Sequence, residues 1–204
     1  MGEEATEDSK FEEKICISPE ISIGYTVHSM LHSATVDMDP TKLHMLNRFE
    51  KTSSGGHQYS PEGTNVKIII SGRDWSNKNI NIYGSNSTEE ANQYMEKISE
   101  IVKDIGHKFE IKQGPQISNL AINGDFGSDI HLEDLYLSLS QEKYDTVYEP
   151  EQFPGLKITL SEPSCTFLLF GTGTFVIQGL NKKSNIEPAI EHIVELLSNE
   201  KYFS

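Results

Sequence analysis

The sequence predicts an α+β fold built from two similar parts, each an antiparallel sheet segment with helices on one face. Three observations support this prediction. Ser87 and Ser184 are each followed three residues later by a glutamate, a pattern that caps the start of a helix. Each serine follows a strand-like run that ends in glycine. Residues 164–170 and 174–178 are apolar runs joined by a glycine turn, which is typical of an antiparallel hairpin.

Similar signals recur in the same order in both halves of the chain. Residues 59–62 (YSPE) resemble residues 148–151 (YEPE). The strand-like runs before the two capping serines end at Gly84 and Gly179. These matches, which fall in the same order in both halves, indicate an internal duplication.

Composition divides the chain into three segments. Residues 1–18 carry many carboxylates and little to bury, so we expect an acidic disordered tail there. The first repeat is expected over residues 19–107 and the second over residues 108–204.

The whole chain has a formal net charge of −14, which opposes binding to a polyanion unless the charge of the binding face differs from the average. No apolar run is long enough for a membrane span, so we expect an intracellular protein without a membrane partner.

Apolar residues at helical spacing predict the helices. The stripe after Ser87 consists of Ala91, Tyr94, Met95, Ile98, Ile101, Val102 and Ile105. The stripe after Ser184 consists of Ile186, Ala189, Ile190, Ile193, Leu196 and Leu197. A shorter helix is expected to begin at Asp39-Pro40, an N-cap followed by a proline. It would bury Leu43, Leu46 and Phe49, and its counterpart would lie near Leu132, Leu135 and Leu139.

We expect no catalytic residues, no metal site and no cofactor. Carboxylates are abundant, but none forms a recognisable motif with a nucleophile or a metal ligand. His28 and His32 have a spacing that suits a metal on a helix, whereas this segment is predicted to be a strand. Cys16 and Cys165 are far apart, which argues against a disulfide framework. The protein is therefore predicted not to be an enzyme.

Alternation along the last two strands predicts an apolar open face. Side chains of successive strand residues point to opposite faces. One face holds Cys165, Phe167, Leu169, Phe175 and Ile177. The other holds Thr166, Leu168, Phe170, Thr174, Val176 and Gln178. If the amphipathic helices cover the first set, then Leu168, Phe170 and Val176 form an uncovered apolar surface, which usually indicates a binding site. The alternative, that a second copy or a further element covers this face, stays open.

Residues 106–197 resemble the second repeat of the TATA-binding protein family. The resemblance is carried by the proline-rich turn of residues 148–156 and by the hairpin of residues 164–179. It implies a two-repeat saddle with a curved antiparallel sheet and helices on the convex face. It also implies a transcription initiation factor that binds AT-rich promoter DNA in the minor groove and bends it. The chain resembles a divergent homologue from a protist or a large DNA virus, which would place it in a nucleus or at a site of viral transcription.

The resemblance assigns expected roles to individual residues. Asn119 matches an asparagine that recognises base acceptors in the minor groove, and Ala121 matches a base-contacting valine. Phe153 and Phe170 match two phenylalanines that wedge into a base step and kink the DNA. Leu168 and Val176 match flanking apolar contacts. Glu149 and Glu151 match residues that dock transcription factor IIB, with Gln152 in place of a leucine, and the assembly would recruit RNA polymerase.

Several positions depart from the family pattern. Phosphate-binding cations of the family fall on Thr159, Glu162, Ser164 and Thr174, and a base-contacting threonine falls on Gln178. In the first repeat, the expected first strand around residues 26–30 offers no asparagine, and no wedge phenylalanine can be assigned. Asn81 and Tyr83 are expected on its open face. Its candidate phosphate contacts are Lys67, Arg73 and Lys78.

Two functions therefore remain open. The first is a DNA-binding general transcription factor, favoured by Asn119, Phe153 and Phe170 together. The second is an adaptor that keeps the fold and docks transcription factors with weak or no DNA binding. The acidic balance and the missing phosphate ligands favour the adaptor.

Overall fold

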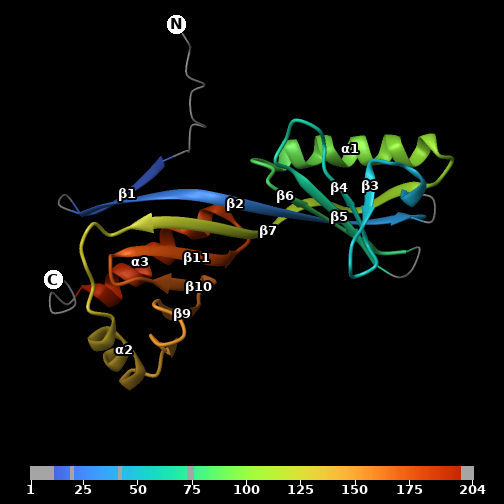
Figure 1. The fold of residues 1–204 in the computed structure, drawn as a ribbon. Coiled ribbons are helices and arrows are strands. Elements are labelled where there is room, and N and C mark those ends of the chain that lie inside the picture. The colour runs from blue at the N-terminus through green and yellow to red at the C-terminus, as the bar shows by residue number, and fades with distance from the viewer. Residues whose placement is uncertain (1–11, 19–20, 41–42, 73–75, 199–204) are drawn as a thin grey trace, which may run out of the picture. The chain divides into compact units, whose positions relative to one another are not determined.

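The computed structural model describes residues 12–18, 21–40, 43–72 and 76–198. The chain forms two compact units: a first-repeat unit, Ser29–Leu120, and a second-repeat unit, Ala121–Ser204 together with Met1–His28. Strands β2 (Ile21–Met38) and β7 (Phe109–Asp125) each pass from one unit into the other (Figure 1). The units therefore divide inside these two strands, after His28 and after Leu120.

The first-repeat unit is a sheet with a long helix on one face (Figure 1). Its strands lie in the order β3-β4-β5-β6-β2-β7. Beyond β2 and β7, these are β3 (Phe49–Lys51), β4 (His57–Tyr59), β5 (Lys67–Ser71) and β6 (Lys78–Tyr83). A short 3-10 turn, η1 (Leu43–Met45), precedes β3, and helix α1 (Thr88–Asp104) follows β6. The core joins Ile68, Ile70, Ile80 and Ile82 of the sheet to Met95, Ile98 and Val102 of α1.

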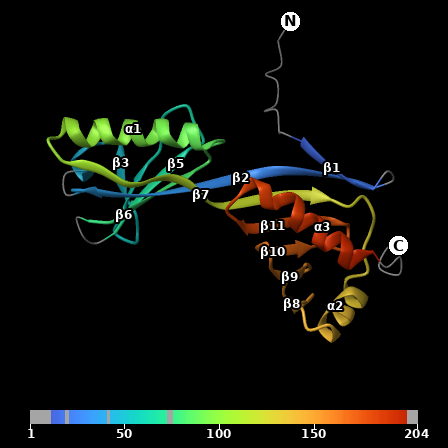
Figure 2. The same cartoon turned by 180° about the vertical axis from the view of Figure 1, so that it is seen from behind.

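The second-repeat unit repeats this order of elements. Its strands lie in the order β7-β11-β10-β9-β8. Beyond β7, these are β8 (Asp145–Val147), β9 (Leu156–Ser161), β10 (Ser164–Leu169) and β11 (Thr174–Leu180). Helix α2 (Leu132–Gln141) precedes β8, and the turn η2 (Lys183–Asn185) leads into α3 (Ile186–Leu197), which lies across β11 and β10 (Figure 2). Strand β1 (Glu12–Ser18) pairs with the start of β2.

The predicted helical stripes are buried where they were expected. Helix α1 buries Ala91, Tyr94, Met95, Ile98 and Val102, and α3 buries Ile186, Ala189, Ile190, Ile193 and Leu197. Helix α2 buries Leu132, Leu135 and Leu139. These side chains cover one face of each sheet, so the α+β prediction is confirmed. No helix in the described ranges is long and apolar enough to cross a membrane.

The two predicted helix caps differ. Ser87 accepts a hydrogen bond from the Glu90 amide at 3.0 Å, as a capping serine should. The Glu90 carboxylate accepts from the amide of Asn86 and not from that of Ser87. The prediction for Ser184 is wrong, because this residue lies inside η2, and α3 begins after Asn185 without a side-chain cap.

Two further expectations from the sequence are corrected. Residues 12–18 of the expected tail form strand β1, whereas residues 1–11 lie outside the described residues. The helix expected at Asp39-Pro40 is replaced over its described part by η1 and β3. The carboxylate of Asp39 pairs with His107 at 2.8 Å, which ties the start of this segment to the residues just before β7.

Candidate nucleic-acid interface

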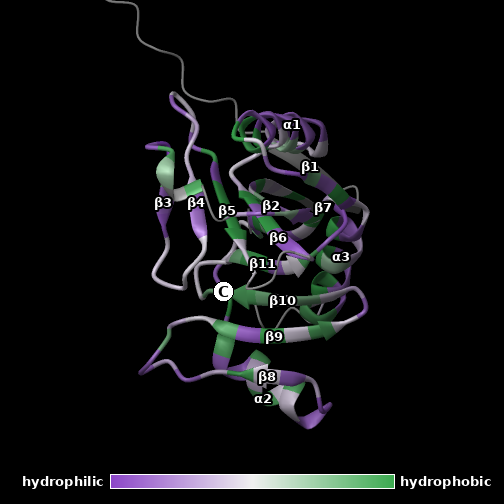
Figure 3. Ribbon diagram, turned by 90° about the vertical axis from the view of Figure 1, so that its right-hand side faces the viewer, coloured by the Kyte–Doolittle hydropathy of each residue, from purple (hydrophilic) through white to green (hydrophobic). Residues whose placement is uncertain are grey.

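The second-repeat unit presents an uncovered apolar face on β10 and β11. Leu168, Phe170 and Val176 are only partly buried, and Leu168 lies directly opposite Val176. On the other face, Phe167 and Phe175 are 0% and 1% exposed, with ring centroids 4.9 Å apart. Figure 3 shows β10 as a largely hydrophobic ribbon. The alternation predicted for this hairpin is therefore confirmed: one side forms the core and the other faces outward.

Two phenylalanine rings meet at one end of this face. Phe153 and Phe170 have ring centroids 5.8 Å apart in an edge-to-face arrangement, and Phe153 is 43% exposed. Both rings pack over Gly155, where an added Cβ would lie 2.6 Å from Phe153 and 3.0 Å from Phe170. A side chain at this position would displace the two rings from the backbone. We call Phe153 and Phe170 the wedge pair.

Each ring of the wedge pair is presented by a turn. The amides of Gln152 and Phe153 both donate to the carbonyl of Glu149 at 2.9 Å, which closes the turn before β9. Phe170 begins the turn between β10 and β11, where its amide donates to Thr174 O at 3.0 Å. Gly173 in that turn has a φ of +82°, a conformation that glycine adopts without strain. Phe153 and Phe170 are thus held outward by hydrogen-bonded backbone.

The acidic turn beside the wedge pair is exposed. Glu149, Glu151 and Gln152 all face solvent. Behind this turn, the ring of Tyr148 lies 6.0 Å from that of Tyr136 in α2, which ties the base of the turn to the helix. The carboxylates are therefore accessible to a basic partner, as their assigned docking role requires.

The first-repeat unit presents a more polar face on the corresponding strands. Ile69 of β5 and Ser33 of β2 both lie opposite Asn81 of β6. In the next row, Tyr83 lies between Lys67 and Leu31. Tyr83 is 39% exposed and Lys67 is exposed. The predicted placement of Asn81 and Tyr83 on the open face is confirmed.

No exposed wedge pair occurs among the described residues of the first-repeat unit. Phe49 stacks on Tyr59 with centroids 5.3 Å apart, but Phe49 is only 6% exposed and belongs to the core. Trp75 lies outside the described residues. The β3–β4 connection, which corresponds to the turn that carries Phe153, is a tight turn in which Gly56 N donates to Thr52 Oγ1 at 2.9 Å. The YSPE sequence at 59–62 instead runs from the end of β4 toward β5, so it does not correspond in the fold to YEPE at 148–151.

The candidate phosphate contacts of the first-repeat unit differ in their exposure to solvent. Lys67 is exposed on the open face. Lys78 is 2% exposed and donates to the carbonyl of Gly72, so it is not a surface cation. Arg73 lies outside the described residues.

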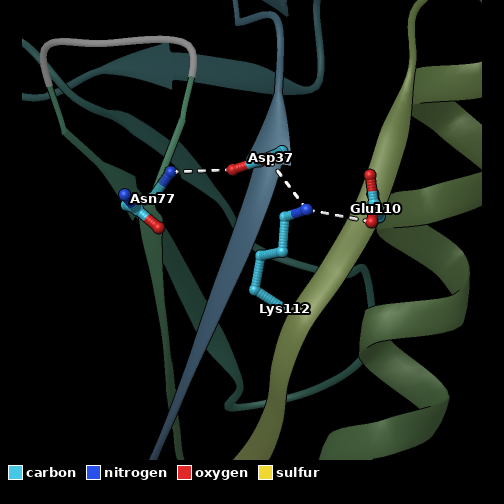
Figure 4. A network of polar contacts seen from close by, with 4 residues as sticks. All are labelled: Asp37, Asn77, Glu110 and Lys112. Atoms are coloured by element: carbon cyan, nitrogen blue, oxygen red, sulfur yellow. Dashed lines mark hydrogen bonds and ion pairs between the residues drawn. The ribbon is translucent and has the colours of Figure 1, made fainter.

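A further lysine of this unit, Lys112, is paired with carboxylates (Figure 4). Its Nζ lies 2.9 Å from Glu110 and 3.2 Å from Asp37, and these contacts, with Glu110 first, raise the pKa of Lys112. Asp37 also accepts from the amide of Asn77 at 2.9 Å, the main reason that its pKa is lowered. The positive charge of Lys112 is therefore offset locally.

Asn119 and Ala121 are both partly buried in β7, but they belong to different units. Ala121 is in the second-repeat unit with Phe153, Phe170, Leu168 and Val176, whereas Asn119 is in the first-repeat unit. Gln178 is exposed at the end of the open face of β11, opposite Thr166. The structure thus brings the two phenylalanines together as predicted, and Asn119 is held in the other unit.

Two residues of these faces were missed by sequence reasoning. Lys157 of β9 is exposed and lies opposite Leu168, which puts a cation on the open face of the second-repeat unit. The alternating apolar residues of β9, Leu156, Ile158 and Leu160, could have revealed it. Ser33 was missed because the first strand extends to Met38, beyond the expected residues 26–30. The alternation of Ala34, Val36 and Met38 carries that signal.

Other polar groups are bound within the structure. The ring of His32 is buried, with Nδ1 2.8 Å from Ser85 Oγ, and does not form a pair of ligands with the exposed His28. Across the described ranges, no group of His, Cys, Asp and Glu could hold a metal ion. Burial raises the pKa of Cys165 to about 11, so its thiol is not a reactive thiolate.

Comparisons with known proteins agree with this fold. Residues 114–200 match the family described as "Transcription factor TFIID (or TATA-binding protein, TBP)". A TATA-box-binding protein of Methanocaldococcus jannaschii is 29% identical over 89% of this chain and 95% of its own length. That of Methanothermococcus thermolithotrophicus is 35% identical over 61% of this chain and 67% of its own. That of Haloarcula marismortui is 35% identical over 57% of this chain, which spans 61% of the relative. The solved structure "Methanococcus jannaschii TBP" matches with a TM-score of 0.72 and 27% identity, covering 85% of this chain and 98% of that one.

The fold of this chain is that of the solved TATA-binding protein structure. The chain belongs to the TATA-binding protein family. This is a family of DNA-binding general transcription factors and not of enzymes.

Proposed function

We propose that this protein is a general transcription initiation factor that binds AT-rich promoter DNA in the minor groove and bends it. The observation that carries the proposal is the exposed wedge pair at the end of an uncovered apolar sheet face. Aromatic and aliphatic wedges of this kind enter a widened minor groove and unstack a base step. Membership of the family supports the same assignment.

The wedge pair and the sheet face have separate tasks in this mechanism. Phe153 and Phe170 enter a base step and kink the duplex, at a cost of roughly a few kcal/mol for unstacking. Leu168 and Val176 then pack against the sugars and base edges of the widened groove, and this contact offsets the cost of the kink. The Gly155 backbone holds the rings in place before DNA arrives, so little side-chain freedom is lost on binding.

Electrostatic attraction contributes less to the DNA affinity of this protein than to that of most DNA-binding proteins. The chain has a net charge of −14, and the exposed lysines on the open faces of the two units include Lys157 and Lys67. Each phosphate contact adds roughly 0.9 to the slope of log affinity against log salt. We therefore expect a shallow salt dependence, with affinity supplied mainly by apolar contact.

Titration against labelled duplexes tests the proposal. A TATA-containing duplex and a scrambled duplex of the same composition are titrated at low and moderate salt. We expect a complex with the TATA duplex that persists at moderate salt, and weak binding to the scrambled duplex. Absence of binding to either duplex, with a folded protein, would contradict the proposal.

The adaptor function is the second candidate, and one observation favours it. Lys78 is buried and Lys112 is paired with two carboxylates, so two of the cations of the first-repeat unit are withdrawn from a phosphate backbone. An adaptor would bind transcription factors normally and fail to bind both duplexes.

We further propose that the acidic turn docks a factor-IIB-like protein, through which RNA polymerase is recruited. Glu149 and Glu151 are exposed on a turn next to the wedge pair, and basic groups of a partner would pair with them. Reversal of both charges to lysine should weaken factor binding at least tenfold in a pull-down titration, since like charges would then face each other. Reversal of the exposed Glu191 and Glu195 on α3 is the matched control. Equal binding by both variants would show that this docking site is wrong.

A further inference from the structure

A cleft opens just beyond the C-terminal end of helix α1 in the first-repeat unit. Its volume is about 680 Å³. It is lined chiefly by residues 37–39, at the end of β2, and by residues 106–110, which lead from α1 into β7. We call it the His107 cleft.

The backbone that carries His107 is fixed by the end of α1. The amide of Gly106 donates to Lys103 O at 2.8 Å, and the amide of His107 donates to Val102 O at 3.1 Å. Gly106 has a φ of +79°, so these two bonds form the Schellman motif that commonly ends a helix. The imidazole of His107 is therefore placed in the cleft lining by hydrogen-bonded backbone.

Asp39 determines which nitrogen of the His107 ring carries the proton. Nδ1 of His107 lies 2.8 Å from Asp39 Oδ2. An ionised carboxylate only accepts hydrogen bonds, so Nδ1 donates, and in the neutral ring Nε2 is left as an acceptor. Nε2 is buried and has no hydrogen-bond partner among the described residues. Because a buried acceptor without a donor destabilises a fold, we look to a ligand of the cleft for that donor.

The charges around the cleft favour a donor that is also positively charged. Three carboxylates line the cleft, those of Asp37, Asp39 and Glu110. They face two lysines: Lys108, which is in the lining, and Lys112, which lies between Asp37 and Glu110 (Figure 4). Three carboxylates against two lysines leave one negative charge. The C-terminal end of the α1 dipole, which is also negative, lies next to the cleft.

The lining also offers apolar surface for the stem of a long side chain. Met38 is 2% exposed and belongs to the core, and Phe109 is partly buried against the same core. Arginine combines an apolar stem with a planar cation that stacks on aromatic rings and carries five N–H donors. Lysine has the charge but not the planar group. The cleft therefore suits arginine best.

We propose that the His107 cleft is a docking site for an arginine side chain of a partner protein. One N–H of the guanidinium donates to His107 Nε2, and another pairs with the carboxylate of Glu110. The planar group stacks on the ring of Phe109. The net charge of −14 favours a partner whose docking segment is basic.

Titration of the full-length protein with short peptides tests this inference. The probe is a blocked glycine peptide with one central arginine, and it is compared with the same peptide carrying citrulline or lysine. Citrulline has nearly the shape of arginine without its charge. Nuclear magnetic resonance follows the backbone signals of residues 106–110. We expect saturable shifts with the arginine peptide, about tenfold weaker binding of the citrulline peptide and about threefold weaker binding of the lysine peptide.

Two variants should change the affinity for the arginine peptide in opposite directions. His107→Phe should weaken binding about tenfold, because the ring stays and the Nε2 acceptor is lost. Lys112→Met should strengthen binding by about threefold, because Asp37 and Glu110 lose the cation that now competes for them. Lys103→Met removes the same charge from an exposed position of α1, so it is the matched control and should leave the affinity nearly unchanged. Unfolding cannot strengthen binding, so Lys112→Met still tests the inference if His107→Phe does not fold.

Three results would overturn the inference. The first is the absence of saturable shifts at residues 106–110 with the arginine peptide. The second is equal binding of the citrulline or the lysine peptide, since the cleft would then not recognise a guanidinium. The third is a gain of affinity in Lys103→Met as large as that in Lys112→Met, because net charge alone would then explain it. None of these results depends on whether the protein binds DNA.

Discussion

The open faces of the two units differ although their strands follow the same order. In the second-repeat unit, Leu168 pairs with Val176, and the wedge pair lies at the end of the face. In the first-repeat unit, Ile69 pairs with Asn81, and Lys67 pairs with Tyr83. The covered faces of both units are mainly apolar, although His32 and Lys78 are also buried in the first-repeat unit. The fold therefore depends on the covered face, and the outer face is free to take different chemistry in each repeat.

The turns differ as much as the faces. The connection from β8 to β9 extends outward and carries Phe153 together with Glu149 and Glu151. The corresponding connection from β3 to β4 is closed tightly by Thr52, and its neighbouring aromatic residue, Phe49, is buried. The β3–β4 connection of the first repeat thus carries neither a wedge phenylalanine nor the acidic residues of the β8–β9 connection. The comparison predicts that the two units act on DNA by different means.

The largest expected effect is on the free energy of unfolding, and it separates the covered face from the open face. Phe167→Ala should lower the free energy of unfolding by about 3–5 kcal/mol, because it opens a cavity beside Phe175 in the core. Leu168→Ala, one residue away on the open face, should cost less than about 1 kcal/mol. Denaturant unfolding measures both. Equal losses would show that the open face is packed against something in the free protein.

The core of the fold was predictable from the sequence where its elements are long. The stripes of α1 and α3 and the alternation of β10 and β11 extend over enough residues to show a clear period. Strands β3 and β4 each contain three residues, which is too short for alternation to be recognised. The matching letters of YSPE and YEPE then led to a correspondence that the fold does not have.

The candidate site was also predictable from the sequence only in part. Phe153 and Phe170 could be paired from their motif, whereas Ser33 and Lys157 needed the strand ends and registers. Two local signals failed for a physical reason. Ser184 lies within a 3-10 turn, and the Asp39 carboxylate pairs with His107, a residue that is distant in sequence.

The two helix starts give a smaller effect. Ser87→Ala should cost about 1 kcal/mol, because the Glu90 amide loses its acceptor at the start of α1. Ser184→Ala should change stability by less than about 0.5 kcal/mol, since Ser184 does not cap α3. Thermal unfolding of the two variants side by side checks this difference. A loss for Ser184→Ala as large as that for Ser87→Ala would contradict the assigned start of α3.

The smallest effect concerns the charges of the first-repeat unit. Asp37→Asn combined with Glu110→Gln should release Lys112 to contact phosphate, since both of its carboxylate partners become neutral. The slope of log affinity against log salt should steepen by at most about 0.9, the value of one phosphate contact. Glu96→Gln with Glu100→Gln makes the same charge change at exposed positions of α1 and serves as the control. An equal steepening in both variants would mean that net charge alone is responsible.

Unstacking of the bound duplex tests the proposed function most directly. Because the described residues of the first-repeat unit hold no exposed wedge pair, we predict that the protein kinks DNA at one end only. The fluorescent base 2-aminopurine, which brightens when it unstacks, is placed at each step of the site in turn. We predict one strong increase, at the step occupied by the wedge pair, and its loss in the Phe153→Ala, Phe170→Ala variant. Two equal increases at opposite ends of the site, or one that survives this double substitution, would contradict the account.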